Sequence, residues 1–492
     1  MLEKFLQEYI DDLYDKQNMS AFKEQQGLFT KKDYYELLLP VVQLITKYKD
    51  YSINELRQIL FEKSGLEEKI KDFVYHKEMT PGIVLSYGTK KYRETIVVGN
   101  KSEVTVDDRG NLVPNVTDMT EDTIFDLAST TKIFTSLSIL KLVQLGVIKL
   151  NDPIIKWEPR FKNLKDVTIF DLISFKTPVI TDARIDGILN LSEAEDTIFT
   201  MHINENFIHG TNPYTDMGAI VLKYVIESAT GLNYYKFVEE NILKPLNMYD
   251  TYANVPKMKL NRLASTNFES RVFDDGKIIN FPYVKEEEVN DPKARALGHS
   301  QGILSGHAGL FSTAKDMTNF AKGVIDRKII NDEYIEKLVK NRTGEKFLKN
   351  GKEQYIQYLG FLCYSKNPIL ANSELFHAMS GKSFAIGGYT GTQLTVDPIN
   401  ELFLYMGSNR VHNRVSYVAP NQRKNIKYDE FGKGIFVMPD GQQKVTSYSF
   451  AWDRDNAAIH PSLKLSIQYK MLEDIYTLYN EKIEVSDKTR KF

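Results

Sequence analysis

The spacing of apolar side chains changes near residue 76, and the change predicts two kinds of structure. Residues 1–75 carry apolar side chains at helical intervals, so we expect a helical N-terminal extension. Pro81 begins a different pattern, in which strand-like runs at 82–87 and 92–98 are separated by a glycine and two lysines. This arrangement is typical of a β-hairpin.

The segments that follow indicate one mixed α+β domain. Apolar runs stopped by glycine, and residues that favour helix caps, predict helices at 133–145, 217–229, from Asn233 to before Pro245, at 313–325 and at 463–479. Strands are expected at 358–364, 392–396 and 402–406, the last two joined by a turn at 397–400. Because strands lie toward both ends of the sequence, distant parts of the chain should pair. Residues 413–460 are polar and predict an irregular insertion or flap.

The charge balance excludes several classes of partner. The chain has 492 residues, with 63 Lys and Arg against 65 Asp and Glu, and no long basic run. A nucleic-acid partner or an anionic membrane is therefore not expected. Cys363 is the only cysteine, so no internal disulfide can form, and the 8 histidines are scattered without a zinc-binding spacing. We expect no metal and no cofactor.

The first residues and the apolar runs bear on location. The N-terminal residues mix acidic with apolar side chains, unlike a secretory signal peptide. The longest apolar stretch, 37–45, is too short to cross a bilayer. The prediction is a cytoplasmic protein with no membrane span, and the oligomeric state stays open.

Several serines lie in motifs that can carry a nucleophile. Ser300 lies in a G-x-S-x-G pentapeptide, Gly298–Gly302, but neither a strand before it nor a helix after it is predicted. That motif works as a sharp turn between a strand and a helix, so a glycine-rich loop is the better interpretation. S-x-x-K pairs begin at Ser20, Ser129, Ser138 and Ser312. We expect Ser312 at a helix cap, Ser138 within a helix and Ser20 in a polar stretch.

Ser129 and Lys132 differ from the other pairs because they lie at the first turn of the most apolar helix. One helical turn separates them, so their side chains share a face. We expect burial to lower the pKa of Lys132 toward neutrality, which would let the amine act as a base. The alternative is a capping serine beside a lysine that reaches solvent.

The segment Thr123–Lys132 resembles the active-site segment of the serine β-lactamase and penicillin-binding-protein superfamily. Within that superfamily it is most similar to class C β-lactamase-like proteins and family VIII esterases. Further ordered similarities lie at Pro81-Gly82, Tyr214-Thr215-Asp216, Ala229-Thr230-Gly231, Pro245–Met248, Gly306–Ala314, Gly388–Thr392 and Ser408–Arg410. Together they cover roughly residues 76–412 and the final helix. The resemblance implies an antiparallel sheet flanked by helices, a helical subdomain, and a hydrolase domain over 76–492 behind the extension at 1–75.

The resemblance also assigns roles to residues. Ser129 would attack a carbonyl carbon and form an acyl-enzyme, and Lys132 would take its proton. Tyr214 would pass the proton to the leaving group. Asp216 stands where asparagine is frequent and would orient Lys132 or the substrate. The substrate implied is a small acyl compound.

The third motif of the superfamily departs from its usual form. K-T-G or H-T-G is common, but this chain has Ile386-Gly387-Gly388, which offers no cation or hydroxyl. Gly387 and Gly388 would leave the strand edge clear, and the N–H groups of Ser129 and Tyr389 would form the oxyanion hole. An uncharged ester or amide is therefore the expected substrate. His377, Lys382 or Arg410 could replace the missing cation.

Other functions remain open at this point. A serine hydrolase fits best, whereas an acyltransferase, a D-amino-acid peptidase or β-lactamase, and an inactive ligand-binding homologue are alternatives. The prefix 1–75 could instead bind a partner, although its aromatic residues are better explained as core. His307 lies between small residues and is expected to be buried with its hydrogen bonds satisfied.

Overall fold

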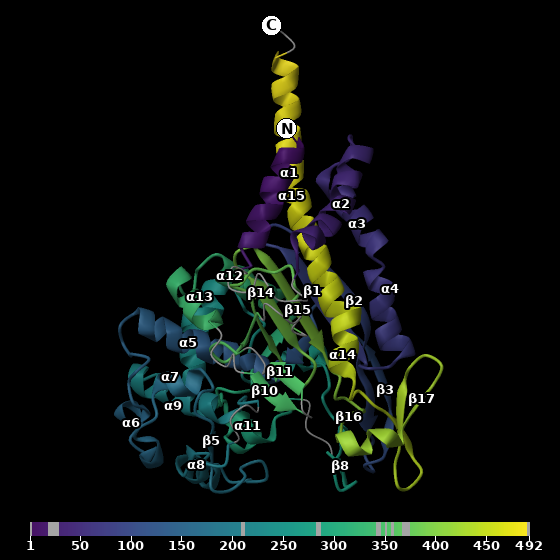
Figure 1. The fold of residues 1–492 in the computed structure, drawn as a ribbon. Coiled ribbons are helices and arrows are strands. Elements are labelled where there is room, and N and C mark those ends of the chain that lie inside the picture. Colours follow the sequence, from purple (N-terminus) through teal and green to yellow (C-terminus); the bar gives the residue numbers. More distant parts are fainter. Residues whose placement is uncertain are drawn as a thin grey trace.

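The computed structural model describes residues 2–17, 29–207, 212–281, 287–340, 346–349, 352–355, 359–366 and 374–489. Its centre is a seven-stranded antiparallel sheet with the order β12-β13-β14-β15-β1-β2-β3 (Figure 1). These strands span Tyr364–Ser365 (β12), Phe384–Gly387 (β13), Gln393–Asp397 (β14), Leu402–Ser408 (β15), Gly82–Thr89 (β1), Arg93–Val106 (β2) and Leu112–Asp118 (β3).

The predicted pairing of distant segments is confirmed at β1. This strand forms the expected hairpin with β2 on one side and pairs with β15 on the other, with Ile83 opposite Ser408 and Thr89 opposite Leu402. The turn between β14 and β15 also agrees with the sequence, because Asp397 Oδ1 accepts the N–H of Ile399 and of Asn400, each at 3.1 Å.

Successive side chains along each strand point to opposite faces of the sheet, so they pack into two separate cores, one on each face. Val84 packs with the helix α12 (Ala314–Ile325), whereas its neighbours Ile83 and Leu85 pack with the helix α15 (His460–Thr489). The second core also contains buried side chains of the N-terminal helices, which span Leu2–Asp15 (α1), Lys31–Lys47 (α2), Ile53–Ser64 (α3) and Leu66–Lys71 (α4). The long α15 rises from the body with α1 beside it (Figure 1).

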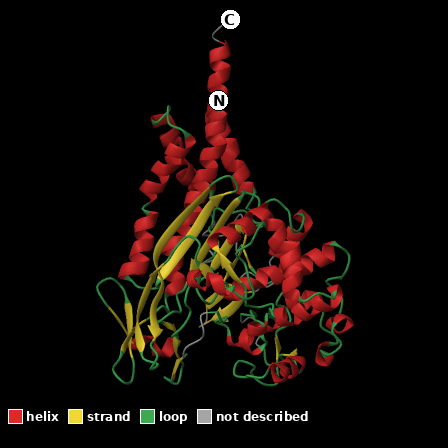
Figure 2. Cartoon of the chain, turned by 180° about the vertical axis from the view of Figure 1, so that it is seen from behind, coloured by secondary structure: helices red, strands yellow, loops and turns green. Residues whose placement is uncertain are grey.

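A helical part lies to one side of the sheet, as Figure 2 shows from behind. Its helices span Lys132–Gln144 (α5), Ile154–Trp157 (α6), Ile169–Ile173 (α7), Leu191–Phe199 (α8), Met217–Thr230 (α9), Tyr234–Val238 (α10) and Pro292–Ala296 (α11), with Asp332–Val339 (α13) nearby. The predictions for α5, α9, α12 and α15 are confirmed. Asn233 caps α10 as expected, because its side chain accepts the N–H of Tyr235 and Lys236.

Small sheets complete the chain. Their strands span Ile124–Asp126 (β4) with Phe311–Thr313 (β9), Val179–Ile180 (β5) with His202–Ile203 (β6), and Lys346–Lys349 (β10) with Lys352–Tyr355 (β11). A three-stranded sheet joins Val415–Val418 (β16), Ser270–Val272 (β7) and Ile278–Asn280 (β8), and another joins Ile426–Tyr428 (β17), Gly434–Val437 (β18) and Gln443–Val445 (β19). No helix in the described ranges is both long and apolar enough to cross a membrane.

Two expectations about local structure are wrong. The strand expected at 358–364 forms only at its end, where Tyr364 begins β12. Before it, Phe361 N–H donates to Leu338 O and Leu362 N–H donates to Ile173 O, so these groups bind helices instead of a strand. Residue 358 lies outside the described residues. Residues 413–460 are not irregular, since they contain β16 to β19 and the helix Phe450–Arg454 (α14).

Candidate active site

Ser129 lies in a single 3-10 turn, Ala128–Thr131, between β4 and α5. The residue before it, Ala128, has φ +46, a left-handed conformation that a residue with a Cβ adopts at a cost. The buried carboxylate of Asp126 stabilises this turn, because its Oδ1 accepts the Ala128 N–H at 2.8 Å. The turn leaves Ser129 partly exposed at the start of an otherwise buried helix.

Two threonines after the third motif hold the chain just before Ser129. Thr390 Oγ1 donates to Asp126 O at 2.7 Å, and Thr392 Oγ1 donates to Leu127 O at 2.9 Å. Both threonines are fully buried. The turn between β13 and β14 is therefore hydrogen-bonded directly to the backbone just before Ser129.

Lys132 is fully buried and has an acceptor for each of its three protons. Its Nζ lies 2.9 Å from Ser129 Oγ, 2.7 Å from Asp216 Oδ1 and 3.2 Å from the carbonyl of His307. Three acceptors around one nitrogen favour the ammonium form, because a neutral amine would have only two protons to donate.

The expectation that burial lowers the pKa of Lys132 is wrong. Burial does act in that direction, but the negative charge of Asp216 and the neighbouring Tyr214 outweigh it and raise the pKa of Lys132 above its ordinary value. Burial also opposes ionisation of Asp216, yet the adjacent Lys132 holds the pKa of that carboxyl well below its usual range. The pair is an ammonium and a carboxylate.

The ion pair continues into a chain of charges that the sequence did not reveal. Lys293 Nζ lies 3.1 Å from Asp216 Oδ2 and 3.5 Å from Asp291 Oδ2. His307 is 1% exposed and bonds Asp291 through Nε2 at 3.0 Å and Ser305 through Nδ1 at 3.1 Å. The prediction of a buried, satisfied His307 is confirmed. The Asp291-Pro292 start of α11 was visible in the sequence, but its proximity to Asp216 was not.

Asp216, Asp291 and His307 place their ligand atoms within 4.8 Å of one another, a spacing that can suit a metal ion. Lys132 and Lys293 already bind the two carboxylates, so a cation there would meet two positive charges at close range. The donor set therefore suits lysine better than a metal.

Tyr214 lies between two aromatic rings beside this cluster. Its ring stacks on Phe175 with centroids 5.2 Å apart and on Tyr364 at 6.2 Å. Lys132 Nζ lies 5.0 Å from the centroid of the Tyr214 ring. A cavity of about 550 Å³, lined by residues 180–186, 214–217 and Lys293, opens beside the tyrosine.

The residues expected to form an oxyanion hole also come together here. Among the described residues, no group accepts a hydrogen bond from the N–H of Ser129 or Tyr389. Gly388 packs so closely on the nucleophile turn that a Cβ would lie 2.4 Å from Leu127 O and 2.2 Å from Thr392 Oγ1. A Cβ on Gly387 would meet only the ends of the Gln393 and Arg454 side chains within 3.7 Å.

Comparisons with known proteins decide the family. The family model described as Beta-lactamase matches residues 95–426. The chain belongs to the β-lactamase family. Its antiparallel sheet flanked by helices is a β-lactamase/transpeptidase fold.

Proteins similar to this β-lactamase-family chain include a curated relative and several solved structures. A protein of Salmonella typhi named "Putative D-alanyl-D-alanine carboxypeptidase" is 29% identical over 329 residues, which cover 61% of this chain and 73% of the relative. Similar solved structures include an octameric penicillin-binding protein homologue from Pyrococcus abyssi, with 21% identity, 70% and 73% coverage and a TM-score of 0.45. Another is a class C β-lactamase from Rhodobacter sphaeroides, with 14% identity, 70% and 93% coverage and a TM-score of 0.48.

The third motif of this β-lactamase-family chain has a nearby cation that is none of the three residues named from the sequence. Arg454 of α14 donates from Nη1 to Gln393 Oε1 at 3.2 Å, next to Gly387. The same guanidinium binds Asp455 Oδ1 through Nε at 2.9 Å and Nη2 at 2.6 Å. Burial raises the pKa of Asp455 to about 7, although Arg454 opposes the shift. Arg454 was missed because it lies in a segment expected to be irregular.

The residues named as substitutes for the cation lie elsewhere or are engaged. Lys382 pairs with Glu336 at 2.6 Å on the surface, and His377 stacks on Phe29 with centroids 6.0 Å apart. Arg410 Nε donates a hydrogen bond to Tyr389 O at 2.7 Å. It therefore holds the backbone of the residue whose N–H is expected in the oxyanion hole.

The other serine motifs do not form comparable sites. Ser300 is exposed in a 3-10 turn, His299–Gln301, which follows α11 rather than a strand. Ser138 lies within α5 as expected and bonds Phe134 O at 2.7 Å. Ser312 lies in β9, and the cap of α12 is Thr313 instead. The Ser20-Lys23 pair lies outside the described residues.

Proposed function

We propose that the chain is a serine hydrolase that cleaves a small ester or amide through an acyl-enzyme at Ser129. The observation that carries the proposal is the 2.9 Å contact between Ser129 Oγ and the ammonium of Lys132, which is buried and has three hydrogen-bond acceptors. A cation held against a serine oxygen in a water-poor site stabilises negative charge that develops there during attack.

Because Lys132 is charged, we assign Lys132 and Tyr214 catalytic roles that differ from those expected from the sequence. An ammonium cannot accept a proton, so Lys132 acts by stabilising charge and by holding Ser129 Oγ. Tyr214 carries the proton: its hydroxyl gives a proton to the leaving group and takes the proton of Ser129 in exchange, while the Oγ–carbon bond forms and the bond between the carbonyl carbon and the leaving group breaks. Asp216 keeps Lys132 charged and in place. The N–H groups of Ser129 and Tyr389 stabilise the oxyanion.

Deacylation reverses these steps with water. Tyr214 takes a proton from water and returns its own to Ser129 Oγ, while the water oxygen bonds to the acyl carbon and the bond to Ser129 breaks. The products are a carboxylic acid and the free enzyme.

Replacing the nucleophile tests the proposal. Ser129→Ala should lower kcat/KM for p-nitrophenyl butyrate by a factor of about 10³ or more, because covalent catalysis is lost. The same change should abolish labelling by a fluorophosphonate probe. Ser300→Ala is the matched control and should keep both activity and labelling. Loss of labelling in Ser300→Ala but not in Ser129→Ala would overturn the assignment.

A peptidase that recognises a carboxylate is the second candidate, and Arg454 is the observation that favours it. The Salmonella typhi relative is named as a D-alanyl-D-alanine carboxypeptidase, which fits that reading. Arg454 already binds Asp455 through two hydrogen bonds, however, and Glu374 lies 4.0 Å from the same guanidinium, so this cation has acidic partners without a substrate. A neutral substrate is therefore the better match.

Substrate charge separates the two candidates. We expect kcat/KM for p-nitrophenyl butyrate to exceed that for nitrocefin and for a D-alanyl-D-alanine peptide. Arg454→Met should leave ester hydrolysis within about threefold, since a neutral substrate needs no cation there. The control Lys382→Met removes a surface cation near the same motif. A preference for the charged substrates that Arg454→Met removes, and Lys382→Met does not, would establish the peptidase instead.

A further inference from the structure

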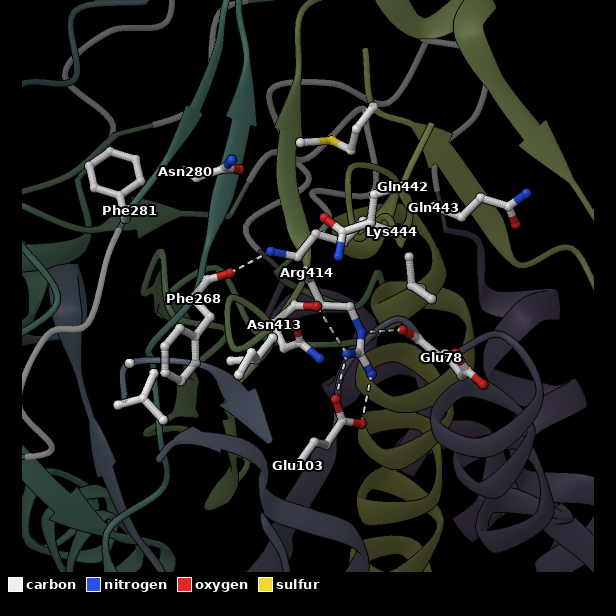
Figure 3. A pocket seen from close by; sticks show the side chains of 15 residues that line it. Glu78, Glu103, Phe268, Asn280, Phe281, Asn413, Arg414, Gln442, Gln443 and Lys444 are labelled. Atoms are coloured by element: carbon white, nitrogen blue, oxygen red, sulfur yellow. Dashed lines mark hydrogen bonds and ion pairs between the residues drawn. The ribbon is translucent and has the colours of Figure 1, made fainter. Parts of the chain in front are cut away.

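A second, larger cavity lies away from the nucleophile. It measures about 810 Å³ and is enclosed by β2 and the turn to β3, by the β7–β8 strands, and by the chain around β19 (Figure 3). None of Ser129, Lys132, Tyr214 and Asp216 lines it. Its volume falls in the range of sites that bind small molecules, about 300–1,000 Å³.

Lys444 of β19 provides the only lining ammonium of this cavity among the described residues. Its Nζ donates to Phe268 O at 2.7 Å and to Ser270 Oγ at 2.9 Å, and both acceptors are neutral. No carboxylate of the described residues forms an ion pair with it. One proton of the ammonium is therefore left for another acceptor.

The other charged groups around the cavity are already paired. Arg414 binds both oxygens of Glu103, at 2.7 and 3.0 Å, as Figure 3 shows. Glu78 is paired with Lys433 at 3.3 Å. Lys444 is thus left as the uncompensated charge, and an anion is the ligand that compensates it.

The electrostatics of Lys444 agree with this geometry. Burial and the nearby charge of Arg414, opposed in part by Glu269, together lower the pKa of Lys444 to about 8. An ammonium in these surroundings gains more from an anionic partner than one in water, because the local dielectric is lower.

Apolar side chains that line the cavity indicate the chemistry of the rest of the ligand. Phe268 and Phe281 lie on one side of the cavity, and Leu112 and Met438 also line it. We propose that this cavity is a second ligand site that binds a small amphipathic carboxylate, with the carboxylate on Lys444 and an apolar or aromatic group against Phe268 and Phe281.

A matched pair of probes tests the proposal by calorimetry on the full chain carrying Ser129→Ala, so that neither probe is turned over. 3-Phenylpropionate should bind at least about tenfold more tightly than 3-phenylpropanamide, which has the same shape without the charge. Lys444→Met should remove this difference while ester hydrolysis in the Ser129-containing protein stays unchanged. Equal binding of the two probes, or unchanged binding of the acid to Lys444→Met, would overturn the proposal.

Two further measurements keep the test independent of how well Lys444→Met folds. Leu112 is 48% exposed, so Leu112→Trp can fill the cavity from a tolerant position and should weaken both probes. In the unsubstituted cavity, affinity for the acid should fall as pH rises through about 8, where Lys444 loses its charge, while affinity for the amide stays level. A flat profile for the acid, or undiminished binding to Leu112→Trp, would place the binding elsewhere.

Discussion

At the scale of single residues, the charge of Lys132 decides how the proton moves. Burial alone would favour a neutral lysine, but Asp216 at 2.7 Å reverses the effect. A cation that stays charged is consistent with Tyr214, rather than Lys132, as the proton carrier.

Asp216→Asn should show which form of Lys132 is active. Without the carboxylate, burial dominates and the pKa of Lys132 falls, so the ammonium is lost at a lower pH than in the native protein. The alkaline limb of the kcat/KM profile for p-nitrophenyl butyrate should therefore move to lower pH. The profile is measured between about pH 5 and 10, within which side chains of this kind titrate.

Lys293→Met is the control for this experiment, because Lys293 contacts the other oxygen of Asp216 at 3.1 Å. Its alkaline limb should stay where the native limb lies. If Asp216→Asn is instead more active than the native protein at neutral pH, a neutral Lys132 is the base and the proposed proton route is wrong.

At the scale of elements, the position of Ser129 depends on how closely β13 approaches the turn before α5. Thr390 and Thr392 bond the carbonyls of Asp126 and Leu127, and Gly388 allows the contact. Hydrogen bonds from a segment distant in sequence thus stabilise the turn in which Ala128 has a left-handed conformation. Nucleophile and oxyanion donors are positioned as one unit.

The two glycines of the third motif should respond differently to alanine. Gly388→Ala places a Cβ 2.4 Å from the backbone oxygen of Leu127, so the turn and the strand must separate. We expect a loss of about 1–3 kcal/mol in stability and a large fall in kcat. Gly387→Ala places its Cβ 2.9 Å from the Gln393 side chain and not that close to backbone, so we expect smaller losses than in Gly388→Ala. Urea unfolding and kcat of the two variants provide the measurement, and equal effects would contradict this account.

Much of this arrangement could be predicted from the sequence, and the reasons for the failures are physical. The apolar helix α5 is local, so periodicity predicted it, whereas spacing left the role of Ser129 and Lys132 open and the family resemblance assigned it. The pKa of Lys132 was misjudged because only burial was considered, although Asp216 was expected beside it and its charge outweighs burial. Arg454 was missed because it lies in α14, within a segment expected to be irregular. Contacts between distant segments, not local patterns, set the charges of the site.

At the scale of the whole molecule, the N-terminal helices and α15 cover one face of the sheet together. Arg57 of α3 is 7% exposed and binds Glu473 of α15 at 2.6 Å, and Thr89 at the end of β1 donates to the same oxygen at 2.8 Å. The side chains at 1–75 that are buried thus belong to the core of the sheet, which favours a collar over a separate partner-binding module.

Arg57→Ala should be strongly destabilising, because Glu473 would keep its charge in a buried position with only a hydroxyl as partner. We expect a loss of about 3–5 kcal/mol in the free energy of unfolding. The double variant Arg57→Met with Glu473→Gln should recover most of it. Lys4→Ala, which breaks the exposed 3.6 Å pair with Glu8, is the control and should change stability by less than about 1 kcal/mol. Equal losses in Arg57→Ala and Lys4→Ala would show that the buried pair does not fasten the collar.

The central position of β1 in the sheet also affects how the chain folds while it is being synthesised. Gly82 N–H donates to Asn409 Oδ1 across 327 positions, and β1 finds its second neighbour only when residues 402–408 have been made. Until then the emerging β1–β2 hairpin has an open edge, and the N-terminal helices must cover their face of the sheet without α15. Long-range pairing of this kind slows folding and leaves apolar surface exposed in the meantime. We therefore expect slow refolding, and a partly synthesised chain that is prone to aggregation.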